Sequence, residues 1–504
     1  MCTSQNAQLV VNQIPSELLV YIFQIVQEAV HCMMIPFTPA WIPFTWVCRH
    51  WRNVSITAPI LWSTIRVTRH PLSTTLWFTT FLERAVGALL DLELHLECGT
   101  DSCRQILGKL RSRASTIRRF TLWLSDRKSP ISDFLFTHMT ELEELTLLDF
   151  CTEDGDAEPL IGTQQDFPRL KRLETAQAYF SWSSPIYWSL RSLTLEKPRV
   201  RPTVEQLLRV LGGCAELETL KLRDALPLSA VAGGAVPIRL PALRQLDVRG
   251  HHSEVSSFIT LIEVPRSCKV DVYHIMRETD EGSLDPILAV IPTQPLFRSL
   301  IHQSTDLSLQ MEDQEVTLFA SSPHGVHLWN HLTGPFEDDP EITPSTWKAF
   351  IDAFSYAPLT HLTVLHNSLQ LVTSEMWQMC FSRFHQLESL AVGPWFVRLR
   401  TGNLHIFETV LAALQASSPL GTGLYCPRLR AVEITGMGID AAGADTLLAM
   451  LERRTSGGAP LEDLSFRSAY CAKEVDAVEL KARINKLVKL TPKCVWSLCI
   501  PLPK

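Results

Sequence analysis

The sequence lacks any Lys or Arg before Arg49, any Cys-x-x-Cys pair and any long Gly/Ser stretch in its 504 residues. Without early basic residues, a secretory signal lacks its charged n-region and a mitochondrial transit peptide lacks its arginines. The thirteen cysteines stand singly along the chain, which is typical of reduced cysteines rather than of a disulfide framework. We therefore expect a cytoplasmic or nuclear protein.

Catalytic motifs are also missing. The chain contains no G-x-x-x-x-G-K-[ST], G-x-S-x-G or H-E-x-x-H, and no G-x-G-x-x-G after a strand pattern. Cys48 and His50 stand two residues apart on a predicted helix, where they would not face each other as nucleophile and base. We expect no enzyme activity and no cofactor, and an enzyme with an unrecognised site is the least favoured alternative.

The best candidate for a metal site is the segment "HGVHLWNH". On a helix, His324, His327 and His331 would share one face, ahead of acidic residues 337–339. Isolated histidine clusters are common on surfaces, and the flanking residues equally suit a solvated loop or helix end. We therefore expect no metal site.

Membrane and nucleic-acid partners are not expected either. Residues 29–48 are uncharged and about long enough to span a bilayer, but Pro36, Pro39 and Pro43 interrupt a helix there, which favours a buried loop. The basic run "RSRASTIRR" (111–119) has no alternating aromatic residues and no nucleic-acid motif. We interpret it as a solvated edge of the repeats described below.

Composition indicates a folded chain with a large core. Hydrophobic residues make up 46% of the sequence and charged residues 20%, which is ordinary for globular proteins. Because 504 residues exceed what one compact core usually fills, we expect several domains or an elongated repeat array. The recurring leucines favour the array.

The first predicted element is a helix in "NQIPSELLVYIFQIVQEAV" (12–30). Pro15 and Glu17 suit a helix start, and two neighbouring apolar stripes follow, one at residues 18, 22, 25 and 29 and one at residues 19, 23, 26 and 30. This apolar arc is wider than a surface helix needs. One stripe can face its own domain and the other a partner.

Two further helical turns are predicted in "VCRHWRNVSITAPILW" (47–62). Val47, Trp51 and Val54 fall on one face of an amphipathic helix, and Pro59 begins a short turn that returns Leu61 and Trp62 to the same cluster. The two tryptophans supply large apolar areas to a unit that has little else to bury.

These three blocks resemble the F-box, especially the F-box-like proteins abundant in mushroom-forming fungi. The resemblance is carried by Ile14-Pro15-x-Glu17-Leu18-Leu19-x-x-Ile22-Phe23, Val47-Cys48-Arg49-x-Trp51-Arg52 and Pro59-x-Leu61-Trp62. The connection between the first two helices departs from the family, because a longer "HCMMIPFTPAWIPFTW" replaces the usual Asp-Leu-rich turn.

The resemblance implies a substrate-receptor subunit of a cullin-RING (SCF-type) ubiquitin ligase. The F-box-like block, residues 12–66, would bind a Skp-family adaptor and through it a cullin, while the rest of the chain binds a client protein. The residues expected to make or support this contact are Ile14, Pro15, Leu18, Leu19, Ile22, Phe23, Val47, Trp51, Leu61 and Trp62. The alternative is a repeat-based interaction scaffold without a ubiquitin-ligase role, in which the block only caps the array.

The remainder of the chain repeats the pattern L-x-x-L-x-L at intervals typical of leucine-rich repeats. The last two apolar positions of each match should point inward from a short strand, as in "TVEQLLRVLGGCAELETLKL", where a helix and a Gly-Gly stop precede the strand. The matches begin at Leu89, Ile117, Leu142, Leu190, Leu217, Leu243, Leu359, Leu387, Leu429 and Leu461, with a weaker one at Leu170.

The pattern resembles the irregular leucine-rich repeats that often follow an F-box. It implies an α/β fold in which the small helical block is followed by a leucine-rich-repeat-like solenoid over residues 67–500, with an irregular insertion at about 270–355. The usual asparagine after the strand occurs only at Asn367, so the other turns must satisfy their backbone groups differently.

Three details of this array can be predicted. Residues 305–320 alternate as a hairpin does, a helix over about 472–490 leads into a terminal strand at "CVWSLCI", and the residues between the inward leucines lie in one row on the strand face. That row comprises Thr146, Thr194, Lys221, Asp247, Thr363 and Ala391.

Overall fold

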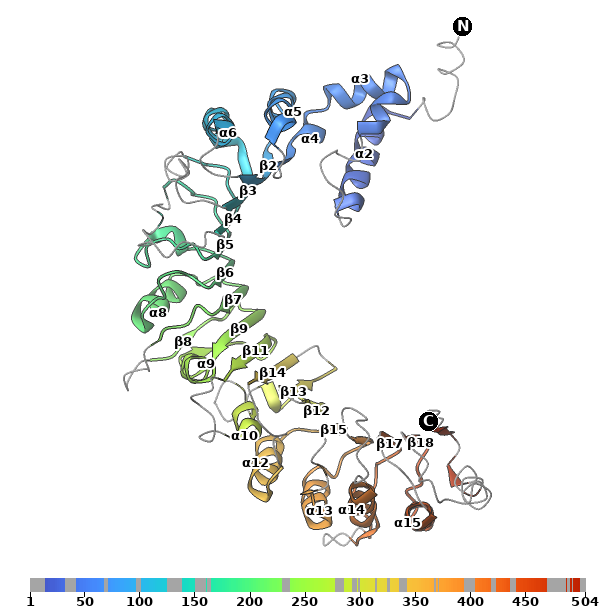
Figure 1. Cartoon of the computed structure of the whole chain (residues 1–504). Helices are drawn as coiled ribbons and strands as arrows, with labels where there is room; N and C mark the ends of the chain where they lie inside the picture. Colours follow the sequence, from blue (N-terminus) through green and yellow to red (C-terminus); the bar gives the residue numbers. More distant parts are fainter. Residues whose placement is uncertain are drawn as a thin grey trace, which may run out of the picture. The chain divides into compact units, whose positions relative to one another are not determined.

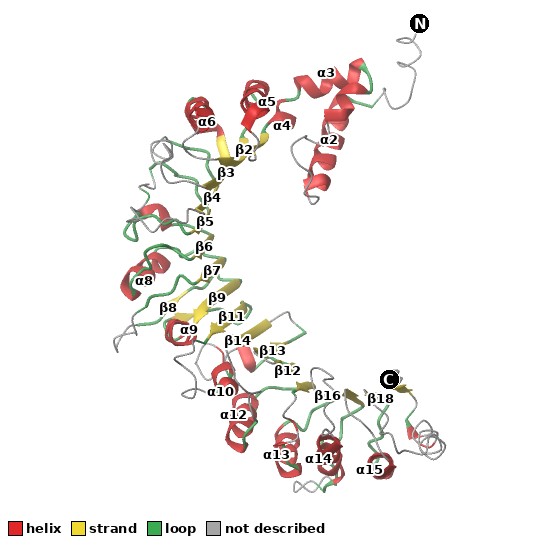
Figure 2. Ribbon diagram, viewed as in Figure 1, coloured by secondary structure: helices red, strands yellow, loops and turns green. Residues whose placement is uncertain are grey.

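The computed structural model shows a mixed α/β protein whose chain divides into two compact units, residues 1–229 and 230–504. Each unit combines a sheet with helices (Figure 2). The structure describes residues 14–31, 42–67, 71–96, 101–124, 138–149, 160, 165–228, 236–276, 285–291, 297, 300–312, 315–323, 327–334, 342–366, 369, 371–393, 404–417, 423–435, 441–468, 486, 490–491 and 493–498.

The first unit begins with helices and continues as strands with intervening helices (Figure 1). Its helical block comprises α2 (Ser16–His31), the 3-10 turn η2 (Ile42–Trp46), α3 (Arg49–Thr57) and α4 (Pro59–Trp62). The strands are β1 (Thr64–Val67), β2 (Leu90–Leu96), β3 (Ile117–Leu124), β4 (Glu144–Asp149), β5 (Arg172–Ala176), β6 (Ser192–Glu196) and β7 (Thr219–Arg223). Between them lie α5 (Pro71–Arg84), α6 (Asp101–Arg111), η3 (Ala114–Thr116), η4 (Pro185–Tyr187) and α8 (Val204–Gly212).

The second unit has the same alternation of strands and helices. Its sheet contains β9 (Gln245–His251), β11 (Lys269–Ile275), β12 (Asp306–Glu312), β13 (Glu315–Ser321), β14 (His327–Thr333), β15 (His361–Leu365), β16 (Ser389–Gly393), β17 (Ala431–Thr435), β18 (Asp463–Ser468) and β19 (Lys493–Leu498). Its helices are α9 (His252–Ile259), α10 (Pro286–Val290), α12 (Pro344–Phe354), α13 (Ser374–Arg383), α14 (Leu404–Gln415) and α15 (Ala441–Ser456). The short strands β8 (Ile238–Arg239) and β10 (Ile262–Glu263) pair separately.

Strands β1 to β7 of the first unit pair in chain order, and every pair is parallel. The inward leucines of the repeat pattern are therefore in register, and they form continuous buried rows across the sheet, one of which is Leu92, Phe120, Leu145, Leu173, Leu193 and Leu220. Helices α5, α6 and α8 lie on one side of these strands (Figure 1). The predicted repeat strands are confirmed here.

A turn that closes just before the strand recurs in both units. The first apolar residue of the pattern donates its backbone N–H to the carbonyl three residues earlier, as Leu217 does to Cys214 at 3.1 Å and Leu429 to Cys426 at 3.0 Å. This bond fixes the leucine in the core where the chain enters the sheet, because both backbone groups are satisfied without water.

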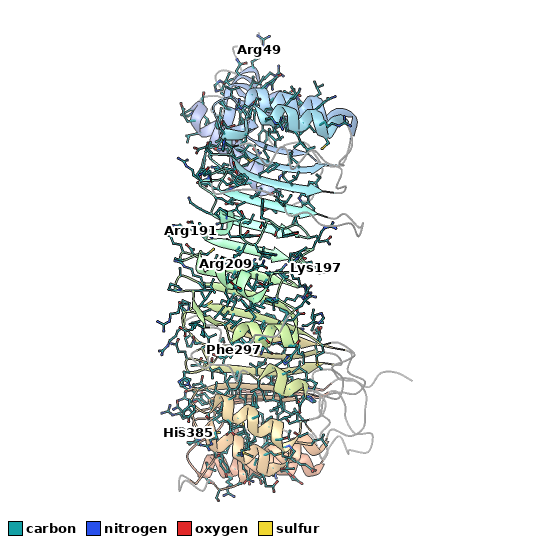
Figure 3. The ribbon with its side chains drawn as sticks, turned by 90° about the vertical axis from the view of Figure 1, so that its left-hand side faces the viewer. Arg49, Arg191, Lys197, Arg209, Phe297 and His385 are labelled. Carbon is teal, nitrogen blue, oxygen red and sulfur yellow. The ribbon has the colours of Figure 1, made fainter. Side chains whose placement is uncertain are left out.

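The chain leaves three neighbouring strands of the first unit through left-handed residues. Gln177, Lys197 and Asp224 follow β5, β6 and β7 directly and have φ angles of 57°, 44° and 50°. The backbone N–H of Gln177 bonds to Glu196 O, and that of Lys197 bonds to Arg223 O, both at 2.8 Å. These backbone hydrogen bonds pair the N–H groups of the turns, which lack the asparagine usual in leucine-rich repeats. Figure 3 shows Arg191 and Lys197, which flank β6, at opposite edges of the strand layer.

The predicted insertion is part of the sheet of the second unit. The strand order is β9, β11, β14, β13, β12, β15, β16, β17, β18 and β19, and only the pairs of β13 with β12 and with β14 are antiparallel. The hairpin predicted at 305–320 is confirmed as β12 and β13. A third strand, β14, returns the chain to the common direction and was not predicted.

Helix α8 shows how local sequence sets the repeat. Thr203 accepts a hydrogen bond from the Gln206 backbone at 3.2 Å, and the Gln206 side chain accepts one from the Thr203 backbone at 2.8 Å, which completes a capping box. Leu207, Val210 and Leu211 then face the core. The helix ends at the predicted Gly-Gly stop.

One position of the predicted repeat pattern needs correction. Leu90 is fully buried at the start of β2, whereas Leu89, the predicted first apolar position, is 38% exposed. The predicted domain boundary after residue 66 falls inside β1, which pairs with β2. The predicted terminal strand is confirmed as β19, and the helix predicted at 472–490 lies almost entirely outside the described residues, as does Asn367.

One polar pair is buried in the core of the second unit. The His274 and Asn330 side chains are joined at 2.8 Å between Nε2 and Oδ1, and Asn330 Nδ2 donates to Val290 O at 2.8 Å. Burial, and to a smaller extent the neighbouring His252, lower the pKa of His274 to about 3.

We expect this pair to make stability pH-dependent. Below the usual histidine pKa of about 6.5, the unfolded chain binds a proton that the folded protein excludes, so stability falls toward low pH by about 1.4 kcal/mol per pH unit. Urea unfolding at pH 7, 6 and 5 should show this slope, and His274→Gln should remove most of it while keeping an amide partner for Asn330. Equal slopes for both proteins would contradict the assignment.

Candidate partner-binding surfaces

The helical block has a small aromatic core between α2, η2 and α3. Phe23 stacks on Phe44 with ring centroids 5.2 Å apart, and Trp51 contacts both rings at 5.4 and 5.9 Å. Leu19 and Phe23 are fully buried. The stripe of α2 that begins at Leu19 therefore faces its own block.

The other stripe of α2 is open to solvent. Leu18, Tyr21, Ile22 and Ile25 are 54%, 60%, 38% and 47% exposed, and their spacing puts them on one helical face. A water-exposed row of four large apolar side chains is costly unless a partner covers it. Tyr21 was missed by the sequence analysis, although its position three residues after Leu18 places it on this face.

The exposed apolar surface also includes η2 and the residue after it. Trp46 is 71% exposed and Val47 is 55% exposed. A hydrogen bond joins η2 to α3, because Arg52 Nε of α3 donates to Thr45 O at 2.9 Å. At the start of α3, the Cys48 sulfur accepts the Trp51 backbone N–H at 3.4 Å. Cys48 thus serves as the N-cap of α3.

The ten predicted partner-binding residues separate into two groups. Of the contact residues expected on α2, Leu18 and Ile22 are exposed, whereas a direct partner contact is wrong for Leu19 and Phe23, which are fully buried. The buried residues are Leu19, Phe23, Leu61 and Trp62; Ile14 and Trp51 are half-buried; and Pro15, Leu18, Ile22 and Val47 are exposed.

Trp62 connects the helical block to the rest of the first unit. Its indole Nε1 donates to Ser55 O of α3 at 2.7 Å, while its ring packs edge-on against Phe81 of α5 at 4.8 Å. The Arg84 guanidinium lies over the same indole, 4.3 Å from the ring centroid. Trp62 thus contributes contacts on both sides of the junction between the block and α5.

The second candidate surface is the strand face that points away from the helices. The predicted row is confirmed within each unit by the register: Thr146, Thr194 and Lys221 belong to one row of the first unit, and Asp247, Thr363 and Ala391 to one row of the second. The row of the first unit also includes Glu93, Thr121 and Glu174.

Charged side chains on this face of the first unit pair with one another. Arg66 Nε lies 2.9 Å from Glu93 Oε2, and Glu144 Oε1 lies 3.5 Å from Arg119 Nε and 3.3 Å from Arg172 Nη1. Such half-exposed pairs contribute little stability, but they neutralise the face.

In the second unit, the insertion places aromatic residues on this face, whereas in the first unit Trp123 of β3 lies there and stacks on His95 with ring centroids 4.6 Å apart. Trp329 of β14 is 41% exposed and meets Phe319 of β13 edge-on at 6.2 Å. Tyr273 of β11 contacts His331 at 4.7 Å, and His331 Nδ1 lies 2.7 Å from Thr317 Oγ1.

The histidine segment considered as a metal site is a strand, so the predicted helical face is wrong for His327 and His331. Within the residues that the structure describes, no group of three potential ligands is close enough to hold a metal ion. His324 and residues 337–339 lie outside them.

Several buried cysteines hold protonated thiols. Burial raises the pKa of Cys214 to about 11 and the pKa of Cys268 and Cys426 to about 12. A thiol with such a pKa carries almost no thiolate at neutral pH, and Cys214 instead donates to Tyr187 O at 2.7 Å.

No helix in the described part of the chain combines the length and apolar character needed to cross a bilayer. Residues 32–41, the centre of the apolar segment considered above, lie outside that part.

Comparison with known proteins adds no family to this description. No protein-family model matches the chain, and no curated protein matches it.

Proposed function

We propose that the chain is a substrate-receptor subunit of a cullin-RING ubiquitin ligase. Its F-box-like block docks on a Skp-family adaptor, and an irregular leucine-rich-repeat-like solenoid presents the strand face to a client protein. The observation that carries the proposal is the apolar stripe of α2 at Leu18, Tyr21, Ile22 and Ile25.

The division of α2 into two stripes supports adaptor docking. Leu19 and Phe23 hold the helix to its block, which leaves the exposed stripe for another chain. Ile14, which is half-buried, and Pro15, which is exposed, extend this stripe toward the start of the helix. Exposed Val47 and Trp46 add apolar area on the neighbouring segment. A large apolar patch on a small helical unit is typical of a protein interface.

The parallel strands support the role of the remainder. Each repeat gives its leucines to a common core and one row of side chains to the opposite face, so that face is continuous within a unit. Arrays of this kind present extended binding surfaces.

The stripe can be tested with Leu18→Asp combined with Ile22→Asp in the full chain. Each substitution places a carboxylate where an apolar contact is proposed, so binding should weaken by about 30- to 700-fold, if each residue contributes about 1–2 kcal/mol. The measurement is co-purification with, and affinity for, a recombinant Skp-family adaptor. Leu19 is a poor probe because a carboxylate there would enter the core.

The matched control is Leu228→Asp combined with Val236→Asp. These residues are 68% and 79% exposed and lie outside the helical block, so the control adds the same charge without changing adaptor affinity. If the Leu18/Ile22 variant keeps the parental affinity, or if the parental chain binds no such adaptor, the scaffold alternative replaces this proposal.

A further inference from the structure

The strand faces of the two units differ in net charge. In the first unit, the in-register outward positions carry the bases Arg66, Arg119, Arg172, Lys221 and Arg223. They also carry the acids Asp91, Glu93, Glu144, Glu174 and Glu196. Bases and acids are therefore equal in number there, and Arg118 at the bulge of β3 adds one more base.

The same positions in the second unit are acidic. The outward acids with described side chains are Asp247, Asp271, Asp306, Glu315, Glu433 and Asp463. The outward bases with described side chains are Lys269, Arg249 and Lys493, and two of them already pair with acids of this face, Lys269 with Asp271 at 3.2 Å and Lys493 with Asp463 at 2.5 Å. Acids exceed bases by three, so the face favours a cationic partner.

Aromatic residues lie beside these carboxylates in one patch. Asp271 is the register neighbour of Trp329, Trp329 that of Phe319, and Tyr273 follows Asp271 by two residues on the same face. We call Asp271, Tyr273, Phe319 and Trp329 the aromatic–acidic patch. Trp329 is its most exposed member and presents an open indole next to a carboxylate.

The carboxylate of Asp271 has one ion-pair partner and is only partly exposed. Lys269 Nζ lies 3.2 Å from its Oδ2, and a base of the client would share that oxygen, because Oδ1 is buried and has no hydrogen-bond donor among the residues that the structure describes. The neighbouring His331 does not supply a positive charge at neutral pH, because burial lowers its pKa. Arg249 of β9 lies in register with Tyr273 and is the nearest base of the adjacent row.

We infer that the aromatic–acidic patch binds an arginine-containing, basic segment of the client, with a guanidinium stacked on Trp329. This inference deepens the proposed function by naming the chemistry of the client. Arginine suits the patch better than lysine because its planar group stacks on an aromatic ring while it still pairs with a carboxylate. The chain itself uses this contact, since Arg84 lies over the Trp62 indole at 4.3 Å.

The insertion explains why the patch occurs here. Strands β13 and β14 bring Phe319 and Trp329 into the row that begins with Asp247 and Asp271, and continues through Ser308 to Thr363. Without these strands the row would hold carboxylates and small side chains only. The three added strands thus give a binding anchor to an otherwise polar face.

The test uses the full chain and a fluorescein-labelled peptide of alternating Arg and Gly. Fluorescence anisotropy should show binding that weakens with salt, and the same peptide with citrulline in place of Arg should bind at least about tenfold more weakly. Trp329→Ala and Asp271→Asn should each weaken binding of the Arg peptide about tenfold. Trp188→Ala, which removes an indole 46% exposed in the first unit, should leave binding unchanged.

Equal affinity for the Arg and citrulline peptides, or an unchanged affinity in Trp329→Ala with the native circular dichroism spectrum, would overturn the inference. The peptide is added without adaptor, so the outcome is independent of docking by the helical block. Peptide binding by a chain that binds no Skp-family adaptor would support the patch and reject the ligase role.

Discussion

Replacing Arg454 with methionine is expected to lower the free energy of unfolding of the second unit by about 3–5 kcal/mol. Arg454 of α15 is fully buried, and its guanidinium donates to three backbone carbonyls: Nη1 to Tyr425 O at 3.1 Å, and Nη2 to Cys426 O at 2.9 Å and Leu429 O at 3.3 Å. These carbonyls belong to the turn before β17. Methionine fills much of the same volume but donates to none of the three carbonyls, and in the described part of the chain only Cys426 O keeps another donor, the backbone N–H of Leu429 at 3.0 Å.

The turn needs this support because Cys426 has a φ angle of 45°, which is unfavourable for a residue with a side chain. Burial lowers the pKa of Arg454, and no carboxylate among the described residues pairs with it. The cost of burying the charge is therefore offset by backbone carbonyls alone. That cost disappears in the methionine variant, which is why the expected loss is smaller than three separate charged hydrogen bonds would suggest.

Arg453 provides the matched control. It is the preceding residue, is exposed, and donates to Ser417 Oγ at 2.9 Å. Arg453→Met should change the free energy of unfolding by less than about 1 kcal/mol. Guanidinium chloride unfolding of the three proteins, followed by circular dichroism, measures the difference. A similar small change in both variants would show that the turn does not depend on Arg454.

Arg453 and Arg454 show which features of a buried charge can be predicted from sequence. Ala444, Leu447 and Leu451 are buried on one face of α15, and Arg454 continues that face at helical spacing. The helical spacing of Arg454 from these apolar residues could thus have indicated that it is buried. The carbonyls that it satisfies lie 25 or more residues earlier in the chain and could not be inferred.

The repeat strands were predictable because their signal is local. A strand that buries alternate leucines needs no information from elsewhere in the chain, and parallel neighbours with the same pattern align in register. Strand β14 was not predictable in the same way. Its polar residues His327, Asn330 and His331 interrupt the alternation of apolar and polar residues that predicts a strand. The buried Asn330 forms hydrogen bonds with His274 and Val290, which belong to distant segments.

The helix α2 and its two apolar stripes were predicted correctly, but which stripe is buried was not. Its sequence is apolar around most of its circumference, so periodicity separates the stripe of Leu18 from that of Leu19 but does not show which of them is buried. The aromatic residues Phe44 and Trp51 decide the outcome by packing against Phe23. Only tertiary structure therefore distinguishes the face that holds the block together from the one that stays exposed.

Replacing Trp62 with alanine should cost about 3–5 kcal/mol in the first unit, because a nearly fully buried indole leaves a large cavity. The substitution also removes the bond to Ser55 O, the contact with Phe81 and the cation–π contact with Arg84. These three contacts reach both the helical block and α5. We therefore expect the block to lose its fixed position along with part of its stability.

Trp77→Ala separates this effect from the loss of any tryptophan. Trp77 contacts the same Phe81 ring at 6.2 Å but is 47% exposed, so its removal should cost less than about 1–2 kcal/mol. Chemical unfolding measures stability, and limited proteolysis reports whether α2, α3 and α4 are still protected. Trp62 lies outside the apolar stripe of α2, so Trp62→Ala should weaken adaptor binding only in proportion to the fraction of chains with an unfolded block. If Trp62→Ala abolished adaptor binding while stability and protease protection stayed at the parental level, Trp62 would itself contact the adaptor, and the docking surface would have to extend from α2 to α4.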